Sequence, residues 1–340
     1  MRPLLHPRLV NGRFGDPALY VEMLHRKGAL LFDMGDLSAL GARDLLRVSH
    51  VFVSHMHVDH FIGFDALLRV CVGRDKTIRM VGPTGFLERV HHKLQSYDWD
   101  LVDRYEADLV FEAKTIERNR PARRARFRFK AAFAWEELPD EETSGGLVEE
   151  AAGLQVHAAL LDHHGPCLGF AVAERAHANV WKNRVDELGL ATGPWLQALK
   201  QAVVDGAPDG TPIILPDGSA APLGDLRPLV TLSEGQKIAY VTDIADTSSN
   251  RAAIEALARG ADSFFLEARF AAADAEQARE RAHLTTQAAG EIARAAGVRR
   301  LEPFHFSPRY EGEESRMIEE VMAAFQGGAP ARNAIVPPTL

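Results

Sequence analysis

The sequence predicts an α/β protein in which two mixed β-sheets are flanked by helices. Two observations carry this prediction. Short apolar runs of strand length alternate with segments in which apolar residues recur at helical spacing. In addition, residue types that bind metals lie at or just beyond the ends of several of these runs, as expected where separate strands meet at one edge of a sheet. A chain of 340 residues can bury a large core in one domain or two.

The expected strands are short runs of apolar and β-branched residues between turn signals. In the first half they cover residues 19–24, 29–32, 51–53, 78–81, 109–116, 127–133, 154–161 and 168–172, with helices at 39–46 and 86–95. In the second half, strands are expected at 238–242, 264–266 and 301–304, and helices at 251–259, 285–296 and 315–325. This alternation favours sheets covered by helices on their outer faces.

The segment His55-Met56-His57-Val58-Asp59-His60 places four metal-binding side chains in six residues, directly after the apolar run 51–53. Alternation along an extended segment puts His55, His57 and Asp59 on one side, and His60 can turn toward a second site. Imidazole and carboxylate are the ligands of catalytic zinc, which keeps one position open for water. The segment therefore predicts a metal centre for hydrolysis. The alternative is a group of surface histidines with an acidic neighbour.

The motif resembles the HxHxDH signature of the metallo-β-lactamase superfamily. Five further segments, in matching order up to residue 310, resemble those of ribonuclease Z enzymes. They are 161–170 with a histidine before a Pro and a Gly-aromatic pair, 241–243, 266–270 and 282–286 for the Glu-Ala-Thr and His-Ser-Thr elements, and 303–310 with a Ser-x-Arg-Tyr tail. The resemblance implies the metallo-β-lactamase αββα sandwich.

The resemblance also implies a two-metal site in which Asp243 bridges the ions, roughly 3.5–4 Å apart. The implied ligands are His55, His57 and His163 for one ion, and Asp59, His60 and His305 for the other. Two Zn²⁺ are expected, with Mn²⁺ as the alternative. Water shared by such ions ionises near neutral pH.

His163 and His164 compete for one ligand position. In an extended segment the two side chains point to opposite faces, so only one readily faces the metals. The family pattern sets the ligand three residues before Pro and six before Gly, which fits His163 with Pro166 and Gly169. We therefore prefer His163, and His164 remains the alternative.

By the same resemblance, His283 is the general acid that protonates the leaving oxygen, and Asp59 also belongs to the catalytic residues. His283 is expected to project from the first turn of the helix at 285–296. Glu267 is expected to orient or charge-stabilise His283, although a local cap or salt bridge would also explain it. Ser307 and Arg309 of the Ser-x-Arg-Tyr tail are the expected substrate contacts.

Residues 174–228 are predicted to form an arm-like insertion in a single metallo-β-lactamase-like domain that spans residues 1–340. Gly193 and Pro194 resemble the Gly-Pro element of the arm with which ribonuclease Z enzymes hold tRNA, so both are expected to bind substrate. The alternative is a helical insertion whose Trp and Leu side chains pack against the core.

The resemblance implies an endoribonuclease that cleaves precursor tRNA at its 3′ end by means of a metal-activated water. The alternative is a small-molecule phosphodiesterase or ester hydrolase of the same fold, which the net charge of −8 favours. A binding module that has lost its chemistry is disfavoured because every expected ligand is present. The basic stretch 118–130 could face phosphates, or it could be a solvated turn and edge strand.

Several features of the sequence indicate the cellular location and the state of the cysteines. No apolar run approaches the roughly 20 residues that cross a bilayer, and the amino terminus lacks a signal-peptide core. A cytoplasmic protein without a membrane partner is therefore expected, and it could also form a homodimer. Cys71 and Cys167 show neither a disulfide framework nor a metal-ligand spacing.

Overall fold

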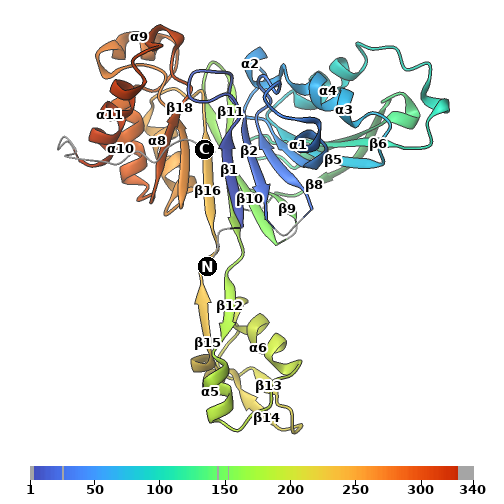
Figure 1. Cartoon of the computed structure of the whole chain (residues 1–340), viewed down its shortest axis with the longest axis vertical. Coiled ribbons are helices and arrows are strands. Elements are labelled where there is room, and N and C mark those ends of the chain that lie inside the picture. Colours follow the sequence, from blue (N-terminus) through green and yellow to red (C-terminus); the bar gives the residue numbers. More distant parts are fainter. Residues whose placement is uncertain (1–3, 25–26, 144, 152, 328–340) are drawn as a thin grey trace. The chain divides into compact units, whose positions relative to one another are not determined.

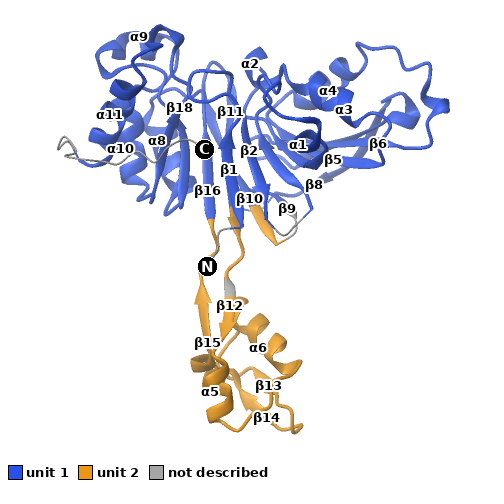
Figure 2. Cartoon of the chain, viewed as in Figure 1, with its two compact units in different colours: residues 1–150, 156–172, 237–340 blue, residues 151–155, 173–236 orange. Residues whose placement is uncertain are grey.

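The computed structural model describes residues 4–24, 27–143, 145–151 and 153–327. The ends of the predicted 1–340 domain, residues 1–3 and 328–340, lie outside the described residues. The chain divides into two compact units (Figure 2). The larger comprises residues 1–150, 156–172 and 237–340, and the smaller comprises 151–155 and 173–236.

The first sheet of the larger unit has eight strands that lie side by side in sequence order (Figure 1). They are β1 (Leu5–Leu9), β2 (Leu19–Met23), β3 (Ala29–Phe32), β4 (Val48–Phe52), β5 (Lys76–Gly82), β6 (Leu109–Thr115), β7 (Ala122–Arg128) and β8 (Trp135–Glu141). The strands from β3 to β6 are parallel, and the pairs at both sides are antiparallel. The helices that follow these strands are α1 (Ala42–Arg47), α2 (Val58–Phe61), α3 (Phe64–Cys71) and α4 (Phe86–Leu94).

The second sheet has the strand order β18-β17-β16-β11-β10-β9. Its strands are β9 (Leu147–Ala151), β10 (Leu154–Asp162), β11 (Pro166–Glu174), β16 (Lys237–Val241), β17 (Ser263–Glu267) and β18 (Leu301–Phe304). The helices on this side are α8 (Ser248–Ala258), α9 (Ala275–Glu280), α10 (Thr286–Ala295) and α11 (Glu314–Phe325). Threonine side chains cap two of them, because Thr247 accepts from the Asn250 amide and Thr285 from the Ala288 amide.

Aromatic side chains fill the space between the two sheets. Phe32 and Phe52 of the first sheet stack with ring centroids 5.0 Å apart. Phe170 and Tyr240 of the second sheet lie 5.9 and 5.8 Å from Phe32. Two further apolar clusters lie on the outer faces of the sheets. One packs the first sheet against its helices, and the other packs the second sheet against its helices. The layer order is therefore helix, sheet, sheet, helix, which confirms the predicted αββα sandwich.

One predicted strand is wrong in its position. The sequence suggested a strand at 127–133, but β7 ends at Arg128 and a 3₁₀ turn follows at Phe129–Ala131. Ala132 and Phe133 then have φ of 50° and 52°, and a strand cannot continue at such positive values. The apolar pattern is real because Phe129 and Phe133 are buried, but they fill a cluster beside a turn.

The smaller unit has a hydrophobic core of its own. Its elements are β12 (His177–Val180), α5 (Lys182–Glu187), α6 (Trp195–Val204), β13 (Pro212–Ile214), β14 (Ala220–Pro222), α7 (Leu223–Leu226) and β15 (Val230–Ser233). β12 pairs with β15, and β13 pairs with β14. The buried core comprises Val185, Trp195, Leu199, Val203, Ile213, Leu223, Leu226 and Leu229. Trp181 and Leu188, in contrast, are 49% and 56% exposed.

Candidate metal centre

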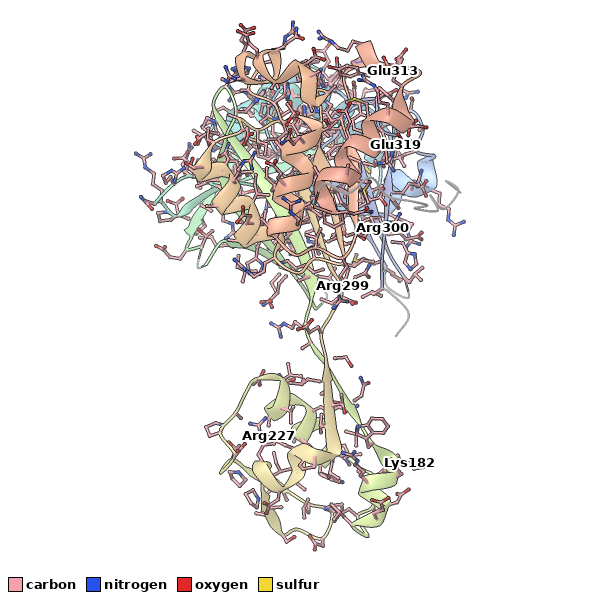
Figure 3. The ribbon with its side chains drawn as sticks, turned by 90° about the vertical axis from the view of Figure 1, so that its left-hand side faces the viewer. Lys182, Arg227, Arg299, Arg300, Glu313 and Glu319 are labelled. Atoms are coloured by element: carbon pink, nitrogen blue, oxygen red, sulfur yellow. The ribbon has the colours of Figure 1, made fainter. Side chains whose placement is uncertain are left out.

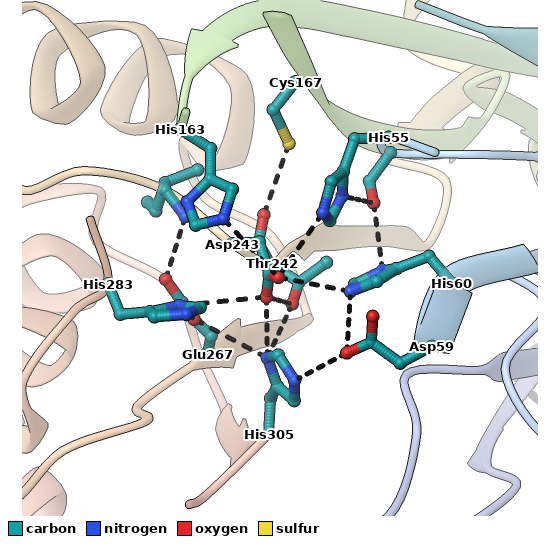
Figure 4. A network of polar contacts seen from close by, with 12 residues as sticks. His55, Asp59, His60, His163, Cys167, Thr242, Asp243, Glu267, His283 and His305 are labelled. Carbon is teal, nitrogen blue, oxygen red and sulfur yellow. Dashed lines mark hydrogen bonds and ion pairs between the residues drawn. The ribbon is translucent and has the colours of Figure 1, made fainter. Parts of the chain in front are cut away.

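Six side chains from both sheets lie around the carboxylate of Asp243, and Figure 4 shows most of them. All of them come from loops or short helices at strand ends, as the sequence suggested. His55 and His57 follow β4, Asp59 and His60 lie on α2, His163 lies between β10 and β11, Asp243 follows β16, and His305 follows β18.

The first group of donors contains His55, His57, His163 and Asp243, with one donor atom from each within 4.8 Å of the others. Asp243 Oδ2 lies 3.5 Å from His55 Nε2 and 4.0 Å from His163 Nε2. The Ala282 carbonyl oxygen lies 2.8 Å from His163 Nδ1, which orients the ring. The structure thus brings His163 into the group, whereas His164 is exposed.

The second group contains Asp59, His60, Asp243 and His305. Asp243 Oδ2 lies 3.2 Å from His60 Nε2, and Asp243 Oδ1 lies 2.7 Å from His305 Nδ1. Asp59 Oδ2 lies 3.6 Å from His60 Nε2 and 3.8 Å from His305 Nε2. Asp243 therefore belongs to both groups, which is the arrangement a bridging carboxylate requires.

Unpartnered nitrogen atoms show that this donor set fits metal ions. Nε2 of His55 and Nε2 of His60 are buried, and although they lie 3.5 and 3.2 Å from Asp243 Oδ2, neither has hydrogen-bond geometry to any described residue. Leaving a buried polar atom without a partner costs about 1–3 kcal/mol. A cation beside Asp243 would satisfy both nitrogens, and imidazole with carboxylate is the donor chemistry that zinc-class ions take.

Asp33 is a buried residue of the site that sequence analysis missed. It is fully buried and accepts hydrogen bonds from the Ser54 amide at 2.6 Å, the Ser54 hydroxyl at 2.8 Å and the Tyr240 hydroxyl at 2.8 Å. Its Oδ2 also lies 2.9 Å from His60 Nδ1. Asp33 thus fixes which His60 nitrogen faces Asp243. Its position directly after the apolar run 29–32 was the available signal.

The charges of the cluster set opposite protonation preferences for neighbouring histidines. Burial and the nearby His60 lower the pKa of His55 to about 2, so this ring is neutral and ready to bind a cation. Burial alone would also lower the pKa of His60, but Asp243 and Asp33 outweigh it and raise this pKa to about 10. Burial disfavours the charged form of Asp243, yet His305 and His60 hold its pKa well below the usual range. A bound metal ion would therefore replace a proton at His60.

Three residues of the site adopt a left-handed backbone conformation, which side chains other than glycine rarely take. Asp33, Asp243 and His305 have φ of 56°, 50° and 57°, and each follows the end of a strand. Such conformations cost of order 1–3 kcal/mol and persist only where the surroundings enforce them. Here they turn Asp243 and His305 from their strands into the donor groups, and Asp33 toward His60.

His283 belongs to a third group of possible donors, with Asp243, Glu267 and His305, and it is held by a carboxylate. Glu267 is fully buried, and its Oε2 lies 2.9 Å from His283 Nδ1. Glu267 Oε1 accepts from the amides of Ile244 at 2.9 Å and Leu284 at 3.2 Å. Burial opposes ionisation of Glu267, but His283 lowers its pKa to about 2.

The position of His283 corrects one prediction. The sequence suggested that it projects from the first turn of a helix, but α10 begins at Thr286 and is capped by Thr285. His283 lies ahead of the cap, after Ala282 with φ of 52°. Thr285 caps the helix, so His283 lies in the preceding loop, where its ring contacts Glu267.

A pocket of about 350 Å³ opens onto the cluster. Its walls include His57, Asp59, His163, Asp243 and His283 of the predicted site. Three further residues line it, namely His164, Arg269 and Arg281. Sequence analysis gave Arg269 and Arg281 no role, and an arginine within a sequence carries no signal that it faces a pocket.

The four predicted substrate contacts lie outside these pocket walls. Ser307 is half-buried, and its amide donates to the Arg269 carbonyl oxygen at 3.0 Å. Arg309 is exposed, contacts Gln277 and stacks over the Phe270 ring at 5.4 Å. Gly193 and Pro194 immediately precede α6 in the smaller unit.

Solved structures with the same fold support a class assignment. The metallo-β-lactamase fold protein YhfI from Bacillus subtilis matches with a TM-score of 0.54 at 15% identity, covering 94% of this chain and 92% of that one. The short form of human tRNase Z matches with a TM-score of 0.50 at 17% identity, covering 90% and 92%. These similarities show that the chain has the metallo-β-lactamase fold, and the donor groups described above suit metal ions.

Sequence relatives give the family. A ribonuclease Z from Deinococcus radiodurans is 32% identical over 320 residues, which are 91% of this chain and 92% of the relative. A ribonuclease Z from Geobacillus kaustophilus is 31% identical over 317 residues, covering 90% and 87%. No family model matches the chain. At this identity and coverage, the chain belongs to the ribonuclease Z family.

Proposed function

We propose that the protein is an endoribonuclease that cleaves precursor tRNA at the 3′ end, using two bound Zn²⁺ or Mn²⁺ ions. The observation that carries the proposal is the sharing of Asp243 between two donor groups at an open pocket. Membership of the ribonuclease Z family supports RNA as the substrate. We also propose that the protein acts in the cytoplasm, forms a homodimer and uses residues 174–228 as an arm of one catalytic domain. Among the described residues, no helix has the length and apolar character that a membrane crossing requires.

The proposed ligands are the seven residues of the two donor groups. His55, His57 and His163 would hold one ion, Asp59, His60 and His305 the other, and Asp243 would contact both. When bound, ions of this class supply positive charge to a phosphoryl group and lower the pKa of water. Asp59 is half-buried at the pocket wall, so it is also placed to orient the attacking water.

His283 is the proposed general acid. Its Nδ1 is taken by Glu267, which leaves Nε2 to give a proton to the leaving oxygen. The buried Glu267 carboxylate orients the ring and fixes which nitrogen faces the pocket. Ser307, Arg309 and the Gly193-Pro194 element are the proposed contacts to the RNA.

A small-molecule phosphodiesterase or ester hydrolase remains the second candidate, because the charge distribution favours it. Residues 173–236 carry five Lys and Arg against eight Asp and Glu, a net charge of −3. Figure 3 labels two of the cations of this unit, Lys182 and Arg227, and Arg227 is neutralised by Asp209. An acidic unit repels phosphates unless its contacts are local.

The decisive experiment removes the smaller unit. The amide of Glu174 donates to the Gln236 carbonyl oxygen at 2.9 Å, so a turn of about four Gly and Ser residues can replace residues 176–235. We expect the shortened protein to lose at least about 100-fold in kcat/KM for precursor tRNA and to keep its activity on bis(p-nitrophenyl) phosphate. Remote binding energy promotes reaction only for a substrate that reaches it.

Point variants refine this test without removing the unit. A Cβ at Gly193 would lie 3.6 Å from Trp195, which is an ordinary contact, so Gly193→Ala with Pro194→Ala should fold. Gly210→Ala is the matched control, because its Cβ would meet nothing within 4 Å. Cleavage of precursor tRNA should fall only in the Gly193-Pro194 variant. If wild type with Zn²⁺ or Mn²⁺ cleaves only the small diester, the phosphodiesterase function replaces the nuclease.

A further inference from the structure

Two arginines that line the pocket have no carboxylate partner among the described residues. Arg269 is half-buried, and its only described side-chain partner is His305, with Nη1 2.5 Å from Nε2. The exposed side chain of Arg281 makes no hydrogen bond or ion pair to any described residue. Both line the pocket that opens onto the Asp243 cluster.

The arginines of the basic stretch 118–130 show the usual arrangement. On β7, Arg123 pairs with Glu88 at 3.0 Å, Arg124 with Glu141 at 3.4 Å, Arg126 with Glu112 at 2.9 Å and Arg128 with Asp108 at 2.7 Å. The strand lies between β6 and β8, so it is not the edge strand that the sequence allowed. Its charge is therefore neutralised by carboxylates of the sheet and of neighbouring segments, whereas that of Arg269 and Arg281 faces the pocket.

The positions of the two arginines relative to the proposed chemistry differ. Arg269 contacts a nitrogen of His305, beside the donor group that also contains Asp59 and His60. Arg281 follows the last residue of α9 and precedes His283 by two residues. Positive charge next to a cation site is costly unless an anion joins it. A phosphate group meets this requirement, since guanidinium and phosphate have matching hydrogen-bond geometry.

We propose that Arg269 and Arg281 form a binding site for two successive phosphates of a polynucleotide. Arg269 binds a non-bridging oxygen of the reacting phosphate, and Arg281 binds the adjacent phosphate at the pocket rim. This inference rests on the proposed nuclease function and deepens it. The pocket then selects a backbone with consecutive phosphates over an isolated diester. Arg309 is less suited to this task, because it is engaged with Gln277 and stacked on Phe270.

Neutral and charge-retaining variants test the two roles separately. Arg269→Gln should lower kcat/KM about 10- to 100-fold for both precursor tRNA and bis(p-nitrophenyl) phosphate, the scale of a charge-assisted hydrogen bond. Arg281→Gln should lower the ratio of kcat/KM for RNA to that for the small diester about tenfold. Arg269→Lys and Arg281→Lys should recover part of each loss. Arg126→Gln, which removes a paired arginine far from the pocket in sequence, is the matched control.

Binding provides a readout that does not depend on turnover. With His283→Ala as the background, the affinity for a single-stranded RNA is measured against salt concentration. Loss of one phosphate contact should reduce the slope of log K against log[salt] by about 0.7. Arg281→Gln should show this change and Arg126→Gln should not. Metal content is measured in each variant. If Arg269→Gln loses metal, the role of Arg269 is assessed from the kinetics of Arg269→Lys instead.

The possible outcomes separate this inference from the proposed function. If wild type cleaves precursor tRNA but Arg281→Gln leaves both the substrate ratio and the salt slope unchanged, the two-phosphate site is wrong and the nuclease function stands. If wild type does not cleave RNA, the proposed function fails first. An equal loss on both substrates in Arg281→Gln would overturn the assignment of Arg281 to the adjacent phosphate.

Discussion

His50 lies on β4 and His60, ten residues later, on α2; both are buried, and the Nε2 of neither makes a hydrogen bond to a described residue. Their protonation preferences are nevertheless opposite. Burial and the cations Arg79, Lys114 and Lys76 lower the pKa of His50 to about 4. At His60, the carboxylates of Asp243 and Asp33 outweigh burial and raise the pKa to about 10.

The comparison shows that an orphaned buried nitrogen does not by itself mark a metal site. The groups around His50 are cationic, so a metal ion there would meet repulsion, and the ring serves as a neutral core residue against Phe52. His60 shares its surroundings with carboxylates that attract a cation. Carboxylate neighbours therefore separate a ligand histidine from a structural one.

The largest effect is expected when the shared carboxylate is removed. Asp243→Ala should reduce metal content from about two ions per chain to near zero and abolish turnover, because both donor groups lose their common oxygen. Metal analysis by mass spectrometry of the metal-replete protein checks this. Asp225→Ala, at an exposed aspartate of the smaller unit, is the control. Two ions retained in Asp243→Ala would refute the shared site.

The second prediction concerns whether a histidine beside a carboxylate is always a metal ligand. His283 contacts Glu267, yet we expect His283→Ala to keep both metal ions and to lose 10²–10⁴-fold in kcat, the usual contribution of a general acid. His57→Ala should instead lose metal and turnover together. Kinetics and metal content are measured on the same preparations. Metal loss in His283→Ala would place this residue among the ligands.

The smallest effect concerns the stability contributed by neutral His50. Its folded pKa of about 4 lies below the unfolded value near 6.5, so the folded state binds fewer protons at acidic pH. The stabilisation is complete above pH 6.5 and is lost as pH falls toward 4. Between pH 7 and 5 the free energy of unfolding should fall by about 2 kcal/mol more in wild type than in His50→Gln.

Denaturant unfolding at several pH values measures this difference. His92→Gln, at an exposed position on α4, is the matched control and should follow the wild-type curve. Parallel curves for wild type and His50→Gln would mean that His50 gains a partner on protonation, contrary to its cationic surroundings.

Local patterns in the sequence determined most of the fold. Apolar runs placed strands such as β3 and β18 at their observed residues, because a buried strand needs a continuous apolar face. Spacing and resemblance brought out the seven residues of the two donor groups, from His55 to His305, but not Asp33, which supports His60. Each of them ends or follows a strand, so its position along the chain already indicated the sheet edge.

Tertiary structure alone decided the surroundings of those residues. Asp33 and His50 both occur in or beside apolar runs, but only packing shows that Asp33 supports His60 and that His50 lies among cations. The arginines of β7 and of the pocket look alike in sequence, yet nearby carboxylates pair with the former, whereas no described carboxylate pairs with Arg269 or Arg281. The residue type determines whether a side chain can carry charge, whereas its partners come from distant segments and its pKa depends on burial. These quantities exist only once the chain is folded.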